Sequence, residues 1–141
     1  MTPDDEKTKS RQAGPSVRLL EETIEGCGFE QCEKLLTQGA DANVADEEGN
    51  TPLLWAVLSG KKKVVGLLIG HGADVNCRNQ DGESPLHWAA LSGDVELAEM
   101  LIQKGARVNV KDVFDVTPLR SAVLNDDQDM ADMLMRHAAK S

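Results

Sequence analysis

Side chains that carry acid–base or metal chemistry lie far apart in this chain. The three histidines pair with no cysteine at the spacing of a metal site: they are His71, His87 and His137. The 24 acidic residues form no grouping of nucleophile, base and acid, and plentiful surface carboxylates do not make a catalytic dyad. The sequence therefore predicts a protein that is not an enzyme and that holds no cofactor and no metal.

The one basic run, Lys61-Lys62-Lys63, raises the question of an anion site. It follows Gly60, but the upstream glycine that a phosphate-binding loop requires is absent, because Trp55 stands there. The run lies at the expected start of a helix, where cations meet the positive end of the helix dipole. We expect a solvated patch on the outer side of the molecule rather than a ligand site.

The cysteines are odd in number and show no Cys-x-x-Cys spacing: they are Cys27, Cys32 and Cys77. This pattern disfavours a secreted disulfide framework and favours a reducing compartment, so we expect a cytoplasmic or nuclear protein. Cys27 and Cys32 are expected to be buried rather than redox-active.

The composition of the chain limits the kinds of partner that it can bind. The chain has 141 residues, enough for one ordinary domain, and a net charge of −9. That excess of acid argues against nucleic-acid binding, which needs a basic face, and against anionic membrane surfaces. No apolar run approaches the roughly 20 residues of a membrane-spanning helix. The N-terminus also lacks the basic start and apolar stretch of a signal peptide.

Two independent landmarks repeat along the chain with a step of 33 residues. Gly-Asn-Thr-Pro-Leu at Gly49 recurs as Gly-Glu-Ser-Pro-Leu at Gly82 and as Asp-Val-Thr-Pro-Leu at Asp115. A Gly-Ala pair keeps the same step, at Gly39, Gly72 and Gly105. Two unrelated markers with one period indicate a chain built from repeated units.

Each unit contains the signals of two short helices. Thr51 is a good N-cap followed by a proline at the first helical position, and the helix is expected over residues 52–59. A second helix is expected from about 61 to 70, with apolar residues in one buried stripe. Because one unit cannot bury this stripe alone, the units must stack. The sequence predicts an all-helical solenoid of four helix pairs, joined by extended turns or short β-hairpins.

These motifs resemble the ankyrin repeat family. The segments that carry the resemblance are Ser84-Pro85-Leu86-His87-Trp88-Ala89-Ala90 and Gly72-Ala73-Asp74-Val75-Asn76. The resemblance implies an all-α ankyrin solenoid over residues 14–141, whose helix–turn–helix units are linked by β-hairpin-like turns. The repeats are expected at about 14–45, 46–78, 79–111 and 112–141, after a disordered lead-in over residues 1–13.

The resemblance also implies a function without catalysis. Ankyrin repeat proteins generally hold protein partners on a concave face built from hairpin tips and the first helix of each repeat. Carried onto this sequence, the contact positions are Glu47, Glu48, Asn50, Leu58, Arg78, Gln80, Asp81, Glu83, Leu91, Lys111, Val113, Phe114, Val116 and Leu124.

Each of these surfaces has a second interpretation. The tip acids could attract a basic partner, or could serve only solubility. Phe114 could anchor a partner, or pack against its own repeat. Leu58, Leu91 and Leu124 could form a docking stripe, or half-bury between neighbouring helices.

We therefore expect a monomeric module that recruits or inhibits a protein partner with a basic patch and an apolar pocket. The alternative is a structural subunit or assembly chaperone with a mainly apolar, permanent interface. Three internal roles are also expected. Trp55 and Trp88 should pack between repeats, His87 should bond with Ser84, and the turn asparagines should satisfy backbone groups.

Overall fold

The computed structural model describes residues 14–26 and 28–139, so the expected lead-in over residues 1–13 lies outside the described residues. Within the described part the helices form four pairs. The pairs are α2 (Pro15–Glu25) with α3 (Phe29–Thr37), α4 (Pro52–Leu58) with α5 (Lys62–Gly70), α6 (Pro85–Ser92) with α7 (Val95–Gln103), and α8 (Pro118–Leu124) with α9 (Gln128–Ala138).

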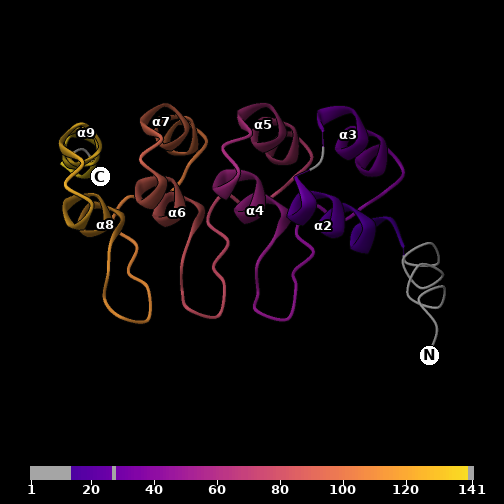
Figure 1. Cartoon of the computed structure of the whole chain (residues 1–141), viewed down its shortest axis with the longest axis horizontal. Coiled ribbons are helices and arrows are strands. Elements are labelled where there is room, and N and C mark those ends of the chain that lie inside the picture. The colour runs from indigo at the N-terminus through magenta and orange to yellow at the C-terminus, as the bar shows by residue number, and fades with distance from the viewer. Residues whose placement is uncertain (1–13, 27, 140–141) are drawn as a thin grey trace.

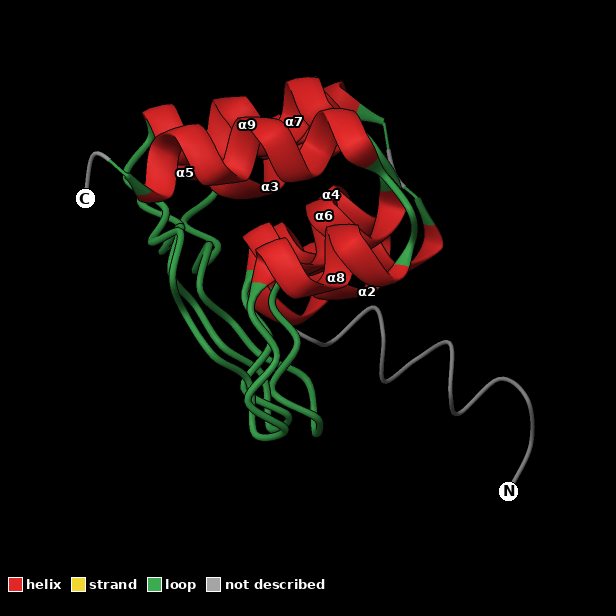
Figure 2. Cartoon of the chain, turned by 90° about the vertical axis from the view of Figure 1, so that its left-hand side faces the viewer, coloured by secondary structure: helices red, strands yellow, loops and turns green. Residues whose placement is uncertain are grey.

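The pairs stand side by side in chain order (Figure 1). The first helices of the pairs, α2, α4, α6 and α8, form one layer, and the second helices form the other (Figure 2). We refer to these as the inner and the outer helices. Each inner helix packs against the inner helix of the next repeat. No strand is found in residues 14–26 or 28–139. The predicted all-helical solenoid is therefore confirmed.

The inner helices begin where the capping signals predicted. Thr51 Oγ1 accepts a hydrogen bond from the backbone N–H of Leu54 at 3.4 Å, and Thr117 Oγ1 accepts one from Arg120 at 3.2 Å. The residue after each cap is a proline, whose missing N–H would have no helical partner at that position. Local chemistry thus determines where these helices start.

The loops between repeats are hairpin-like and pair with one another at their tips. We define the tips as residues 46–50, 79–83 and 112–116. The tip of the second repeat is closed by a backbone bond from Asp46 N to Asn50 O at 2.9 Å. Neighbouring tips are joined by Gln80 N to Glu48 O at 3.0 Å and by Val113 N to Asp81 O at 2.9 Å. The tips therefore form one connected edge of the solenoid.

At the same position of each tip the backbone is left-handed, with φ of 82° at Gly49, 74° at Gly82 and 61° at Asp115. Aspartate adopts this conformation at a higher cost than glycine. At the first two positions the backbone of the following tip lies close by, whereas the described residues contain no further tip after the one that holds Asp115. The side chain of Asp115 therefore has room.

The hydrophobic core runs between the two helix layers through all four repeats. Leu53 and Leu86 are fully buried on inner helices, and Leu68, Leu101 and Leu134 are fully buried on outer helices. These side chains recur at the 33-residue step, so each repeat completes the core of its neighbour. No helix in the described residues is long and apolar enough to cross a membrane.

Turn asparagines connect adjacent repeats. Asn43 Nδ2 donates to Gly72 O at 2.9 Å while its Oδ1 accepts from Asp74 N at 2.7 Å. Asn76 makes the same pair of bonds with Gly105 O at 3.0 Å and Arg107 N at 2.8 Å. The expected role of these amides in satisfying backbone groups is confirmed at both positions.

Candidate protein-binding surface

The inner helices and the hairpin tips form the two arms of an L-shaped profile when the solenoid is viewed along its length (Figure 2). The fold therefore brings the predicted contact positions onto two adjoining surfaces. One is the row of inner helices, and the other is the connected edge of tips.

One exposed aliphatic side chain stands near the C-terminal end of every inner helix. Its exposed fraction is 46% for Ile24, 49% for Leu58, 56% for Leu91 and 70% for Leu124. In each repeat a residue with left-handed backbone follows two positions later: Gly26, Gly60, Gly93 and Asp126. The four side chains thus occupy one structural position. We name them the aliphatic row.

Sequence reasoning missed Ile24 as a member of the row. It precedes Leu58 by 34 residues rather than 33, so it does not fall at the 33-residue spacing of the other members. The signal that would have found it is an aliphatic residue two positions before a helix-ending glycine. The leucines of the row are about half exposed or more.

The tip of the fourth repeat presents apolar side chains to solvent. Phe114 is 75% exposed and Val113 is 59% exposed. Asp112 Oδ1 holds the loop by accepting from Phe114 N at 2.8 Å and from Val116 N at 2.9 Å. Phe114 therefore does not pack against its own repeat, whereas Val116 is half-buried.

The acidic positions differ in exposure. Glu47, Glu48 and Asp81 are exposed on the tips of the second and third repeats, and Glu48 Oε2 accepts a hydrogen bond from Asn50 Nδ2 at 3.4 Å. Glu83 is half-buried, and its Oε1 accepts a hydrogen bond from Asn79 Nδ2 at 3.1 Å. The exposed carboxylates form an acidic edge that a basic partner could meet.

Three predicted contact residues serve the tips themselves. Asn50 is only 4% exposed, and its Oδ1 accepts from Asn79 Nδ2 at 3.0 Å, so its side chain does not face a partner. Gln80 Nε2 donates to Glu47 O at 2.6 Å. Arg78 donates to the carbonyl oxygens of Gly82 and Lys111. We leave Asn50 out of the surface for this reason.

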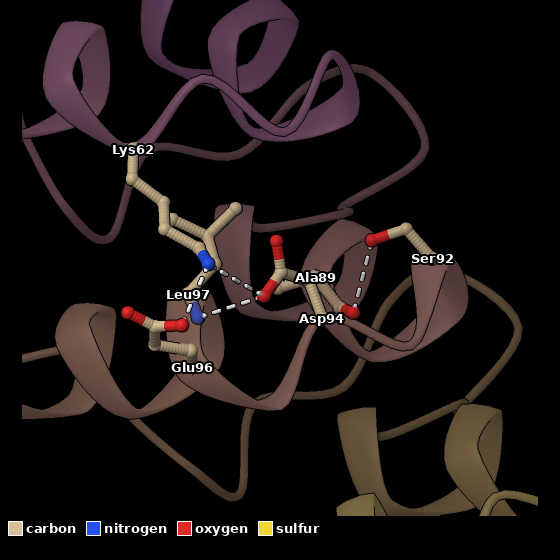
Figure 3. A network of polar contacts seen from close by, with 6 residues as sticks. All are labelled: Lys62, Ala89, Ser92, Asp94, Glu96 and Leu97. Carbon is tan, nitrogen blue, oxygen red and sulfur yellow. Dashed lines mark hydrogen bonds and ion pairs between the residues drawn. The ribbon is translucent and has the colours of Figure 1, made fainter.

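Two residues of the lysine run, Lys61 and Lys62, contact other parts of the solenoid, whereas Lys63 is exposed. Lys62 Nζ lies 2.8 Å from Glu96 Oε2 and 3.7 Å from Asp94 Oδ1, both on the next repeat (Figure 3). The hydrogen bond to Glu96 raises the pKa of Lys62, against a smaller effect of desolvation, and Asp94 adds to the rise. Lys61 donates to the carbonyl oxygen of Gly26. These contacts engage Lys61 and Lys62 within the protein.

His87 is a capping residue. The backbone N–H of Ser84 donates to His87 Nδ1 at 3.1 Å, so this nitrogen is the acceptor and Nε2 carries the proton. Nε2 lies 2.7 Å from Val116 O, on the tip of the next repeat. The buried ring thus links a helix start to the following hairpin. The expected bond with Ser84 is confirmed by a distance of 2.9 Å to its hydroxyl.

Replacing His87 with alanine should lower the free energy of unfolding by about 2–3 kcal/mol, because the hydrogen bonds of the ring and a buried side chain are lost. Leucine already fills this position in the previous repeat, as the fully buried Leu54. His87→Leu should therefore lose only about 1 kcal/mol, since it restores the packing and not the bonds. Urea unfolding followed by circular dichroism measures both. A His87→Leu variant as stable as the wild type would contradict the assigned role of the hydrogen bonds, and equal losses in the two variants would contradict the role of packing.

The remaining chemical groups are internal. Trp55 and Trp88 meet edge to face with ring centroids 5.9 Å apart, on adjacent inner helices, so the expected packing between repeats is confirmed. Cys77 is a free thiol whose pKa is raised by burial. Cys32 is fully buried and disulfide-bonded. No group of three metal-ligating side chains occurs among the described residues.

A repeated helix pair with paired hairpin tips defines a helical repeat solenoid. A family model of three ankyrin repeats matches residues 22–112 of the 141-residue chain. The chain belongs to the ankyrin repeat family. Ankyrin repeats are generally protein–protein interaction modules, and the family is typically non-catalytic. The comparison with curated proteins gave no significant match.

Proposed function

We propose that this chain recruits or inhibits a protein partner through the aliphatic row and the exposed residues of the tips. The observation that carries the proposal is the row itself. Single exposed aliphatic side chains are ordinary on a protein surface. Here four of them, each about half exposed or more, recur at the same structural position of successive inner helices. Together they give the row of inner helices a repeated apolar contact position.

The surface suits a partner of mixed chemistry. Apolar side chains of the partner would cover the row and Phe114, where a desolvated aromatic contributes most of the affinity. Basic side chains would meet Glu47, Glu48 and Asp81, which raise the association rate more than the affinity. The free protein is then a monomer that takes no part in catalysis.

Comparative affinity capture tests this assignment. Leu91→Ala and Phe114→Ala should each reduce the amount of specific partner captured by about tenfold or more, since hot-spot truncations cost about 1.4–3 kcal/mol. Met135→Ala is the matched control, because Met135 is 47% exposed but lies on the outer helix α9. It should capture as much as the wild type.

The charge of the tips is tested separately with the double variant Glu47→Lys/Glu48→Lys. It should slow association and flatten its dependence on salt. If every captured protein binds wild type, Leu91→Ala, Phe114→Ala and the double variant equally, the assignment of the surface is wrong.

A structural subunit or assembly chaperone is the second candidate. It is favoured by Val123, which is 60% exposed beside Leu124 and widens the apolar area at the last inner helix. A permanent interface there would be mainly apolar and would hardly respond to salt. A regulatory interface that includes the acidic tips would weaken steeply as salt rises. Binding measured across ionic strength therefore separates the two candidates.

We further propose a cytoplasmic or nuclear location, which rests on the cysteine pattern alone. The disulfide at Cys32 gives this proposal a direct test. Protein alkylated under denaturing conditions directly on cell lysis should carry a label on every cysteine if its compartment is reducing. A species with Cys32 unlabelled until reduction would overturn the proposal.

A further inference from the structure

A groove of about 700 Å³ lies beside the loop that leaves the outer helix α7. It is lined by residues 105–111 together with Arg78 of the preceding repeat. The segments that leave the outer helices run on the side of the hairpins away from the inner helices (Figure 2). The groove is therefore separate from the aliphatic row.

The charge of the groove is opposite to that of the protein. Its lining includes Arg78, Arg107 and Lys111 and no carboxylate, although the chain carries a net charge of −9. Arg107 stands where the two preceding repeats have Asp41 and Asp74. The third repeat thus reverses the charge at a position whose usual residue is acidic in this chain.

The three cations differ in how they are held. Arg78 is oriented by its bonds to the backbone carbonyls of Gly82, at 3.1 Å from Nε, and of Lys111. The backbone N–H of Arg107 donates to Asn76 Oδ1 at 2.8 Å, which fixes the position of its Cα. The side-chain cations of Arg107 and Lys111 form no hydrogen bond or ion pair with the described residues. They are available to an anion.

Asp74 and Asp112 are carboxylates close in sequence to Arg78 and Lys111, and neither forms an ion pair with a cation of the groove. Asp74 Oδ1 accepts the backbone N–H of Asn76 at 2.9 Å. Asp112 Oδ1 accepts two backbone N–H groups of its own tip. Both side chains are oriented by these turn hydrogen bonds, so the cations of the lining are not directly paired with them.

Part of the groove lining is apolar. Val108 is buried and Val110 is half-buried in the lining. A ligand that fits both features carries carboxylates and an apolar side chain. A nucleic acid fits poorly, because three cations release few counterions and the rest of the protein repels a long polyanion.

We propose that this groove binds an acidic peptide segment of a partner protein, with its carboxylates on Arg107, Lys111 and Arg78 and an apolar side chain against Val110. Arginine suits this role because its guanidinium can hold a carboxylate through two parallel hydrogen bonds. The groove is basic, whereas the tips of the second and third repeats carry exposed acidic side chains. One chain can therefore bind a basic surface of a partner at the tips and an acidic segment of a partner in the groove at the same time.

Calorimetric titration at low salt with a short polyglutamate peptide that carries one central leucine tests the proposal. Wild type should bind the peptide, and Arg107→Asp should weaken binding by about tenfold. Aspartate is the residue of the two preceding repeats at this position, so the variant should keep the fold, as circular dichroism will check. Lys63→Asp makes the same charge change on the exposed face of α5 and should leave the affinity within about twofold.

Two further probes distinguish the anion. Inorganic phosphate and a short polyuridine RNA should bind more weakly than the peptide. The proposal is overturned if wild type does not bind the peptide, or if Lys63→Asp weakens it as much as Arg107→Asp does. Tighter binding of phosphate or RNA through Arg107 would overturn the assignment to carboxylates.

Discussion

Replacing Leu101 with alanine should lower the free energy of unfolding by about 3–4 kcal/mol, among the largest single losses expected in this chain. Leu101 is fully buried on the outer helix α7 of the third repeat. Truncation removes its apolar contacts and leaves a cavity that the neighbouring helices only partly fill. Because each repeat is stabilised by its neighbours, the cavity also weakens the packing of the third repeat against the second and the fourth.

Urea unfolding monitored by circular dichroism measures this loss. The matched control is Leu91→Ala, the same change within the same repeat at a side chain that is 56% exposed. It should alter the stability by no more than about 0.5 kcal/mol. Similar losses for the two variants would contradict the shared core described for the solenoid.

Gly82→Ala should lower the free energy of unfolding by about 2–4 kcal/mol, through two additive causes. The backbone of Gly82 is left-handed, with φ of 74°, which alanine adopts only with strain. A Cβ at this position would also lie 3.1 Å from Val113 N and 3.2 Å from Asp112 Cα on the next tip. These are backbone atoms, which cannot move without breaking the bond between the tips.

Gly72→Ala separates the two causes. Gly72 has φ of 93°, yet a Cβ there would meet no other atom within 4 Å. Its replacement should therefore cost only the conformational term, about 1–2 kcal/mol. Thermal or urea unfolding of both variants should show the larger loss for Gly82→Ala. The reverse order would mean that the close approach of the tips contributes little.

The solenoid itself was predictable because its determinants are local and repeat. Thr51 and Thr117 start inner helices through bonds within three residues of the chain, and the proline after each one reinforces the start. The buried stripe of each outer helix follows from helical spacing. Because this stripe recurs at a constant step and one repeat cannot bury it alone, the repeats must stack to bury it.

The candidate surface was predictable only in part. The positions of Leu58, Leu91 and Leu124 followed from the repeat, but their exposure did not, because a periodic leucine can equally pack between helices. Ile24 was hidden by a single additional residue in the spacing to Leu58. Its place in the row appears only when the ends of the inner helices are aligned by their left-handed residues.

The sequence by itself determined the period, the helix pairs and the caps, since all of these depend on residues close together in the chain. Tertiary structure decided which side of each tip is free. Asn50 accepts a hydrogen bond from Asn79 of the next repeat, and Arg78 donates one to the carbonyl oxygen of Lys111, 33 residues further along the chain. Stacking brings residues 29 to 33 positions apart into contact, and those contacts determine whether a polar side chain supports the fold or faces a partner.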